Sequence, residues 1–414
     1  MTINLIAFAS PLQKKSSLTN SHEAILNELE KYYTVNLVDH TEMETLGADD
    51  FKVVFVASGG VENIVVRHFE QLPRPAILLA DGMQNSLAAA MEVSTWLRQR
   101  GMKSEILHGE LPTISRRMRI LYNNFRAART LNGQRVGVIG TPSPWLVASG
   151  VDYLLAKRRW GVEYVDIPLE QVYERYHRLA DADVGPACAA VVSQAMACRE
   201  GTPDDMVKSM KLYRAIRQVC EEERLEAVTL SCFKMVEDLG VTGCLALSLL
   251  NDDGIPAGCE GDLQSIFTLM VARALVGREG FMANPAMVNT RANELVLAHC
   301  TTGLKLTEKY IIRDHFETGK GIAIQGILPT EDVTLLKCGG ESLDEFYLAT
   351  GTLTENTNYI NLCRTQVRIK LDSPVEYFLK TPLGNHHIVL RGNHVEELNE
   401  FLQANACKRV EYLP

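Results

Sequence analysis

The first 168 residues repeat a pattern that strongly limits the possible fold: short, continuous apolar runs alternate with stretches of helical spacing. The apolar runs lie at 3–10, 35–39, 52–60, 76–82, 135–141 and 162–168. Strands buried on both faces have such runs, and their alternation with helices is typical of parallel sheets covered by helices. We therefore predict a Rossmann-like α/β domain over residues 1–168.

The pattern changes twice further along the chain. Over residues 169–285, charged helical stretches surround a strand candidate at 227–233, which predicts a second α/β domain. From residue 286 to residue 414, short alternating or β-branched runs are separated by Gly, Asp, Asn and Pro. These runs predict a mainly antiparallel, β-rich C-terminal domain. Three domains also agree with a length of 414 residues.

Composition excludes some classes of partner. The net charge of -9 argues against a surface for nucleic acid or an anionic membrane. No apolar run reaches the roughly 20 residues that span a bilayer, and no basic leader precedes the first apolar run. We expect a cytoplasmic protein. The ten cysteines lie in apolar stretches without a CxxC pair, which indicates reduced, buried thiols, and we assign Cys259 to packing.

Ligand-binding signals in the N-terminal domain are weak. The loops at 10–13 and 58–60 follow predicted strands, where parallel sheets bind ligands. The segment 137–140 lacks the spacing of a dinucleotide motif, and a turn into a helix capped by Ser143 explains it better. The basic pairs Lys14-Lys15 and Arg116-Arg117 could meet an anion or be solvated surface charge.

Two acids that flank a glycine give a stronger signal of ligand binding. Glu260 and Asp262 follow the apolar segment 255–259, so they would crowd negative charge at a half-buried strand end. A bound cation would relieve the cost of that charge. Asp262 also precedes an apolar helical stretch, so it could instead cap that helix.

Other candidate ligands are ambiguous from pattern alone. Glu237 follows Lys234 by three residues, a spacing that also fits a surface ion pair on a helix. His386 and His387 are adjacent in a predicted strand, so their side chains point to opposite faces and at most one reaches a given site. His299 ends another predicted strand and could be a ligand or a structural histidine.

These residues together resemble a known family. Residues 250–262, Glu237 upstream, the pair His299-Cys300 and the late segment 384–387 look like the L-fucose isomerase and L-arabinose isomerase superfamily, over roughly residues 227–397. The resemblance implies a Mn²⁺ ion held by two carboxylates and one histidine. In this sequence those positions are Glu237, Asp262 and His386. The resemblance also implies a homo-oligomer, either a trimer or a hexamer.

The expected chemistry follows from such a site. Oxygen ligands with one imidazole suit Mn²⁺, with Mg²⁺ or Co²⁺ as possible substitutes. We expect a metal-dependent aldose–ketose isomerase that converts an open-chain sugar through a metal-bound enediolate. The sugar could be a plain, deoxy or sulfonated hexose or pentose. The predicted acid–base pair is Glu237 and Asp262, and the predicted substrate contacts are Asn385, Lys234 and Glu260. The alternative is a non-catalytic sugar-binding or regulatory protein with the same fold.

Overall fold

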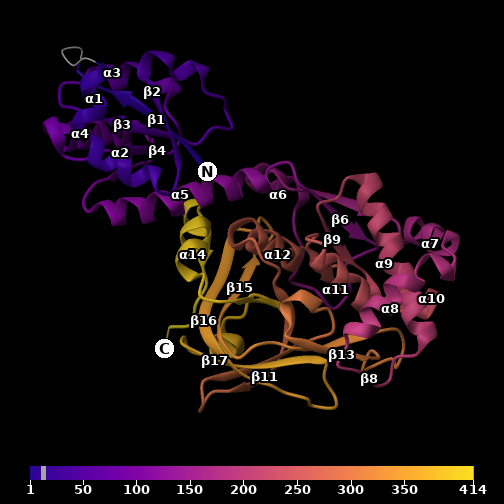
Figure 1. Cartoon of the computed structure of the whole chain (residues 1–414). Helices are drawn as coiled ribbons and strands as arrows, with labels where there is room; N and C mark the ends of the chain where they lie inside the picture. The colour runs from indigo at the N-terminus through magenta and orange to yellow at the C-terminus, as the bar shows by residue number, and fades with distance from the viewer. Residues whose placement is uncertain (11–14, 414) are drawn as a thin grey trace. The chain divides into compact units, whose positions relative to one another are not determined.

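The computed structural model describes residues 1–10 and 15–413. The chain forms two compact units, Met1–Arg129 and Thr130–Pro414 (Figure 1). The predicted fold class is confirmed, because parallel α/β sheets form the first and middle parts of the chain and an antiparallel barrel forms the last part. The boundaries predicted at residues 168 and 285 stay a prediction. Most of the predicted 10–13 loop and Lys14 lie outside the described residues, as does the side chain of Lys15.

The first unit is built on a parallel five-stranded sheet in the order β2-β1-β3-β4-β5. Successive residues of its strands point to opposite faces, so Val53 and Phe55 join one apolar cluster while Val54 and Val56 join another. Helices cover both faces, which explains the continuous apolar runs. Arg117, which could meet an anion or be solvated surface charge, forms an ion pair with Glu105. The elements are β1 (Thr2–Phe8), α1 (Lys15–Ser21), α2 (Glu23–Glu30), β2 (Thr34–Asp39), η1 (His40–Thr45), β3 (Lys52–Val56), α3 (Glu62–Arg67), η2 (Phe69–Gln71), β4 (Ala76–Leu79), η3 (Met83–Asn85), α4 (Ser86–Gln99), β5 (Ser104–Leu107) and α5 (Leu111–Leu131).

The second unit begins with a parallel four-stranded sheet in the order β10-β9-β6-β7. The predicted helix capped by Ser143 is wrong, because residues 141–152 form a loop and the next helix begins at Tyr153. Asp152 caps that helix by accepting hydrogen bonds from the backbone N–H groups of Leu154 and Leu155. The elements are β6 (Arg135–Ile139), α6 (Tyr153–Trp160), β7 (Glu163–Ile167), α7 (Leu169–Arg178), η4 (Asp181–Asp183), α8 (Gly185–Gln194), β8 (Ala197–Cys198), α9 (Pro203–Glu223), β9 (Ala227–Leu230), α10 (Cys232–Leu239), α11 (Cys244–Asp252), β10 (Ala257–Cys259) and α12 (Leu263–Val276).

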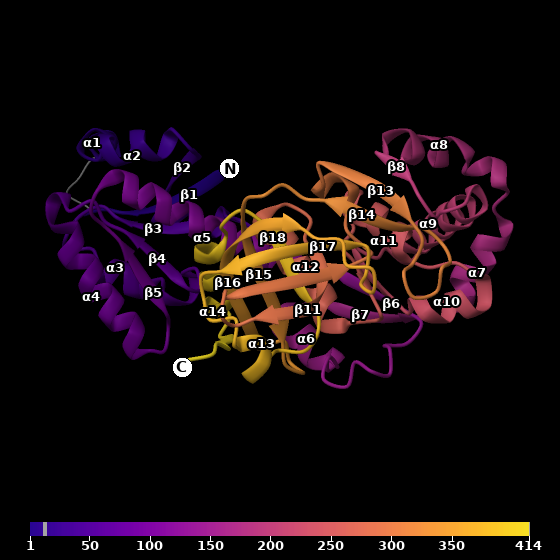
Figure 2. The ribbon, with the colours of Figure 1, turned by 90° about the horizontal axis from the view of Figure 1, so that it is seen from below.

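The rest of the second unit is an antiparallel barrel with a small flanking sheet (Figure 2). The barrel strands follow the order β15-β18-β11-β12-β17-β16, and the barrel closes because β15 also pairs with β16. Closure leaves no free edge along these strands. The flanking sheet has the order β14-β13-β8. The elements are β11 (Phe281–Asn289), β12 (Glu294–His299), η5 (Leu304–Leu306), β13 (Lys309–Arg313), β14 (Ala323–Ile327), β15 (Asp332–Gly339), β16 (Glu345–Asn356), β17 (Thr365–Leu371), α13 (Tyr377–Lys380), β18 (His387–Arg391), α14 (Val395–Ala404) and β19 (Lys408–Arg409).

Helix α12 joins the parallel sheet to the barrel. It contacts β9 and β10 on the sheet side and β15 and β18 on the barrel side. Because it has neighbours on both sides, nearly all of its residues are buried, and its sequence is apolar around most of its circumference. Its N-terminus, at Leu263, therefore lies where the two layers meet. Over the described residues, no helix has both the length and the apolar character to cross a membrane.

Candidate metal centre

A tight turn between β10 and α12 separates the two predicted acids. Glu260 has a φ of 63° and Gly261 a φ of 69°, both in the left-handed region. A Cβ atom on Gly261 would lie 2.6 Å from the Cα atom of Pro142, so only glycine fits there. A non-glycine residue with positive φ is uncommon, and such strain concentrates at functional sites. The turn sends the side chains of Glu260 and Asp262 to different partners.

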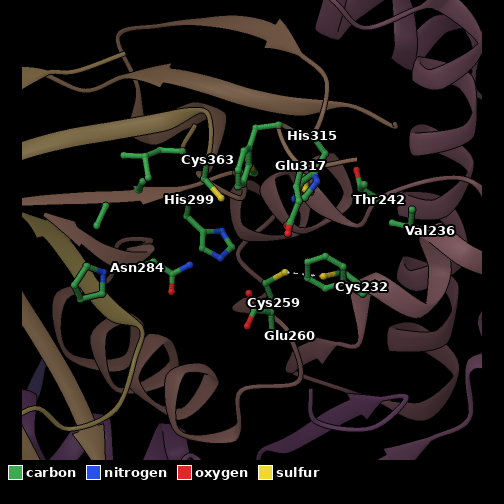
Figure 3. Close-up of a pocket in the computed structure, with 18 residues that line it drawn as sticks. Cys232, Val236, Thr242, Cys259, Glu260, Asn284, His299, His315, Glu317 and Cys363 are labelled. Carbon is green, nitrogen blue, oxygen red and sulfur yellow. Dashed lines mark hydrogen bonds between the residues drawn. The ribbon is translucent and has the colours of Figure 1, made fainter. Parts of the chain in front are cut away.

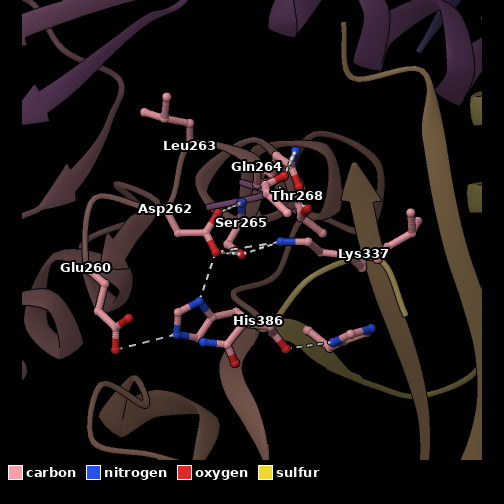
Figure 4. Close-up of polar contacts among 12 residues, drawn as sticks. Glu260, Asp262, Leu263, Gln264, Ser265, Thr268, Lys337 and His386 are labelled. Atoms are coloured by element: carbon pink, nitrogen blue, oxygen red, sulfur yellow. Dashed lines mark hydrogen bonds and ion pairs between the residues drawn. The ribbon is translucent and has the colours of Figure 1, made fainter. Parts of the chain in front are cut away.

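Asp262 is fully buried and caps α12 (Figure 4). Its Oδ1 atom accepts a hydrogen bond from the Ser265 backbone N–H at 2.8 Å, and its Oδ2 atom accepts one from the Ser265 hydroxyl at 2.8 Å. The Lys337 ammonium, also fully buried, lies 3.7 Å from Oδ2. Burial by itself raises the pKa of Asp262, but the charge of Lys337 and the hydrogen bond with His386 bring this pKa well below its usual range. The carboxylate is therefore ionised and surrounded by donors.

His386 connects Asp262 to Glu260 (Figure 4). Its Nδ1 atom lies 2.8 Å from Asp262 Oδ2, so Nδ1 carries the hydrogen and donates it. Its buried Nε2 atom has no hydrogen-bond partner and lies 3.8 Å from Glu260 Oε1. A buried ring nitrogen without a hydrogen bond is costly, and this one points at a carboxylate.

His299 completes a group of three donors. Its ring centroid lies 5.4 Å from that of His386, and its Nδ1 atom shares a 2.9 Å hydrogen bond with the Thr301 hydroxyl. That bond leaves Nε2 available. One ligand atom each from Glu260, His299 and His386 lie within 4.8 Å of one another. Three such donors at this spacing can hold one metal ion.

The electrostatics of the group suit a cation. Burial raises the pKa of Glu260, but His386 and the Trp145 indole, whose N–H lies 2.7 Å from Glu260 Oε2, lower it overall to about 2. Burial, together with the neighbouring His386, lowers the pKa of His299 to about 3. Burial also acts to lower the pKa of His386, yet Asp262 and Glu260 raise it overall. The group thus offers an ionised carboxylate and a neutral imidazole, and the two acids favour a positive charge, either a proton or a metal ion, at the Nε2 atom of His386.

The group opens to a cavity of about 240 Å³ (Figure 3). Glu260 and His299 line this cavity, together with a second carboxylate from Glu317 and the amide of Asn284. Apolar and thiol side chains make up much of the remaining wall. The wall also includes Cys232 and Cys259, whose sulfur atoms lie 3.1 Å apart. A concave, partly apolar site with a few convergent polar groups is the usual form of a small-molecule site.

The structure brings together only part of the predicted site. Glu260, Asp262 and His386 are neighbours, but Asp262 holds His386 while Glu260 faces its free nitrogen. The side chain of Glu237 lies on α10, is 72% exposed and sits 3.4 Å from the Lys234 ammonium. The surface ion pair that its spacing also allowed is therefore present, and Glu237 does not join the buried group. Its role as a ligand stays a prediction.

The predicted substrate contacts are also divided. Glu260 lines the cavity, whereas Lys234 lines a different surface hollow, beside Ser231 and Gly140, and pairs with Glu237 and Asp238. The exposed Asn385 is not among the residues that line the cavity, and its backbone carbonyl lies 3.1 Å from Nδ1 of His387. Substrate binding by Lys234 and Asn385 stays a prediction.

The sequence pattern does not settle the role of every residue near the site. His299 is in the group, and the signal for it is its position at the end of an apolar strand. His387 faces the other way, with its Nε2 atom 3.1 Å from the Tyr377 hydroxyl, which indicates a structural role. Lys337 is not among the predicted site residues, although a single lysine inside the apolar run 333–338 is a signal for a buried charge with a partner.

Known proteins share partial similarity with the chain. A sulfoquinovose isomerase of Alkalicoccus urumqiensis is 23% identical over 225 residues, which are 53% of this chain and 50% of that protein. A sulfoquinovose isomerase of Clostridium sp. (strain MSTE9) is 26% identical over 117 residues, 28% of this chain and 26% of that protein. The match thus spans half of the first relative's length and about a quarter of the second's.

Protein-family models and one aligned solved structure show no informative similarity to the chain. No protein-family model matches the chain. The solved structure of D-threo-3-hydroxyaspartate dehydratase from Delftia sp. HT23 aligns with 94% of this chain and 82% of its own, at 9% identity and a TM-score of 0.16. A TM-score this low carries no argument about fold or function.

Proposed function

We propose that this chain is a metal-dependent aldose–ketose isomerase whose divalent cation is held by Glu260, His299 and His386. One observation carries the proposal: the free Nε2 atom of His386 is buried beside the Glu260 carboxylate and the His299 imidazole, and these two neighbours line a cavity. Partial similarity to two sulfoquinovose isomerases supports a sugar as the substrate.

The donor set fits a divalent transition metal. It contains one carboxylate and two imidazoles, whereas the sequence predicted two carboxylates and one imidazole. Two imidazole ligands favour a transition metal over Mg²⁺, which prefers oxygen, and the carboxylate suits Mn²⁺. We propose Mn²⁺ as the resident ion. The hydrogen bonds from His386 to Asp262 and between His299 and Thr301 fix both rings, as is usual for metal-bound histidines.

The reaction needs polarisation of a carbonyl and transfer of a proton between neighbouring carbons. A bound divalent cation supplies Lewis acidity at the sugar carbonyl and its neighbouring hydroxyl. We assign the proton transfer to Glu317, the cavity carboxylate outside the three-donor group. Its carboxylate takes a proton from the carbon next to the carbonyl and returns it to the former carbonyl carbon, while the hydroxyl proton of that neighbouring carbon passes to the former carbonyl oxygen.

The substrate proposal is a sulfonated hexose in its open-chain form. It rests on the printed names of both relatives and on their partial overlap with this chain. We also propose a homo-oligomer, as the resemblance to the fucose isomerase superfamily implies. Light scattering on the purified protein measures that state directly, and a monomer would contradict it.

The experiment that tests the proposed function is an isomerisation assay on a panel of sugars. Purified protein is loaded with Mn²⁺ and incubated with sulfoquinovose, D-glucose, L-fucose and L-arabinose, and the ketose is measured by NMR. We expect product with wild type, none after chelation, and none with Glu317→Gln although that variant keeps its metal. Product formation in chelated protein would overturn the proposed function.

A further inference from the structure

A second group of metal-binding side chains lies on the wall of the same cavity. Cys244, Cys300 and His315 are buried, and one ligand atom from each lies within 4.8 Å of the others. All three line the cavity, yet none belongs to the group formed by Glu260, His299 and His386. The proposed isomerase reaction does not use them.

Three separate elements bring these residues together. Cys244 is the first residue of α11, Cys300 directly follows β12, and His315 lies two residues beyond the end of β13. A ligand held by all three residues would link α11, the barrel and the flanking sheet. The hydrogen bond with the Cys300 thiol and burial raise the pKa of Cys244 well above its usual value, so a metal ion that binds there must displace a proton.

The surroundings of the group match those of a metal site. The Nδ1 atom of His315 shares a 3.2 Å hydrogen bond with the Thr318 hydroxyl, which leaves Nε2 for a ligand. The backbone N–H of Arg364 lies 3.4 Å from the Cys300 sulfur and can donate to a thiolate. The thiols of Cys244 and Cys300 also interact with each other directly.

The donor chemistry selects a softer ion than the first group does. Two thiolates and one imidazole suit Zn²⁺ in a tetrahedral arrangement, whereas Mn²⁺ prefers harder ligands. We propose that Cys244, Cys300 and His315 form a second metal site, for a zinc-class divalent cation, whose fourth position faces the cavity. The alternative is simple packing, since Cys244 and Cys300 also contact Ala323 in a small apolar cluster.

The test uses Co²⁺ as a spectroscopic probe on the full, reduced chain after chelation. Only a thiolate ligand produces a sulfur-to-cobalt charge-transfer band in the near ultraviolet, so Co²⁺ bound by Glu260 and two histidines does not contribute to it. We expect the band at about one equivalent of Co²⁺ per chain and its displacement by Zn²⁺, the tighter-binding ion at a thiolate site. The Glu260→Gln variant should keep the band, which separates this proposal from the proposed function.

Variants then locate the site. Cys244→Ser and Cys300→Ser should lose most of the band, while Cys188→Ser, a buried cysteine on α8, should keep it. Thr318→Ala keeps all three ligands and should weaken Co²⁺ binding by roughly tenfold, which is a readout that remains if a cysteine variant fails to fold. Absence of the band in reduced wild type, an unchanged band in both cysteine variants, or a Cys244–Cys300 disulfide in protein purified with Zn²⁺ would overturn the proposal.

Discussion

The Nδ1 atom of His386 lies 2.8 Å from Oδ2 of Asp262, and both side chains are fully buried. This contact fixes the ring of His386, so that its Nε2 atom points toward Glu260. It also gives the two acids of the turn different tasks, because Asp262 orients the histidine and Glu260 faces the position where a cation would bind. The acids are only two residues apart, and the left-handed backbone between them separates their directions.

The first prediction compares two glutamates. Glu260→Gln removes the anionic donor of the proposed centre and should lower Mn²⁺ affinity by more than about tenfold. Glu237→Gln alters an exposed residue of an ion pair and should leave Mn²⁺ affinity unchanged. Titration calorimetry on both variants measures the difference. If Glu237→Gln loses the metal and Glu260→Gln keeps it, the ligand set first predicted from the sequence is correct and the one proposed from the structure is not.

The second prediction concerns the buried lysine beside Asp262. Lys337→Met removes a cation that lies 3.7 Å from the Asp262 carboxylate. The buried carboxylate then loses its nearby ammonium and keeps only its hydrogen bonds with His386 and Ser265, so the free energy of unfolding should fall by about 3–5 kcal/mol. Lys370→Met, on an exposed position of β17, is the matched control and should change stability by less than about 0.5 kcal/mol. Urea denaturation followed by circular dichroism measures both variants, and equal losses would contradict the role of the pair.

The third prediction compares two glycines with nearly equal φ angles. Gly261 and Gly240 have φ values of 69° and 67°, so alanine is strained at both. A Cβ atom at Gly240 meets nothing within 4 Å, whereas at Gly261 it meets the backbone of Pro142. Gly240→Ala should cost about 1–2 kcal/mol. Gly261→Ala should cost more and should also weaken Mn²⁺ binding, because the turn that directs Glu260 must shift. Metal affinity that is unchanged in Gly261→Ala would contradict this account of the turn.

The fourth prediction is a pH dependence of stability. Burial raises the pKa of Asp252 from 3.8 to about 6. The hydrogen bonds that it accepts from the backbone N–H groups of Lys305 and Leu304 lower this pKa, but by less than burial raises it. The folded state therefore binds this proton more tightly than the unfolded state. The resulting stability is fully present below about pH 3.8 and is lost as the pH rises through about 6.

Asp252→Asn tests this pH dependence because the amide cannot ionise. The stability of wild type relative to this variant should fall between about pH 4 and pH 6 and stay constant above that range. The fall should be smaller than about 1.4 kcal/mol for each unit by which folding raises the pKa, because solvent screens the partly exposed carboxyl. Urea midpoints measured across this pH range give the result, and a difference that is flat or rises with pH would contradict the raised pKa.

Hydrophobic patterning predicted the fold class well. Continuous apolar runs such as 52–56 became central parallel strands, and the β-branched runs beyond residue 286 became barrel strands. Local capping was harder to predict, since Ser143 and Asp152 are both suitable caps and only the second one begins a helix. The competition between them depends on packing that is not visible in the local sequence.

The candidate site could be predicted only in part. The sequence identifies the acids at 260 and 262 and the histidine at 386, but pattern cannot decide which acid faces the proposed metal position. That choice depends on the left-handed conformation of Glu260 and on the partners of Asp262, which lie about 75 and 124 residues away at Lys337 and His386. Glu237 fitted both a ligand and a surface ion pair, and the exposed face of α10 is a property of tertiary packing.

Solvent exchange at the substrate tests the central claim most directly. Wild type, Glu260→Gln and Glu237→Gln are each incubated with sulfoquinovose and Mn²⁺ in D₂O, and a chelated sample of each is the control. Proton NMR follows the signal of the hydrogen on the carbon next to the carbonyl. We predict deuterium at that carbon with wild type and Glu237→Gln, and none with Glu260→Gln or in any chelated sample. Exchange at the wild-type rate with Glu260→Gln, or in chelated wild type, would contradict a metal centre built on Glu260, His299 and His386.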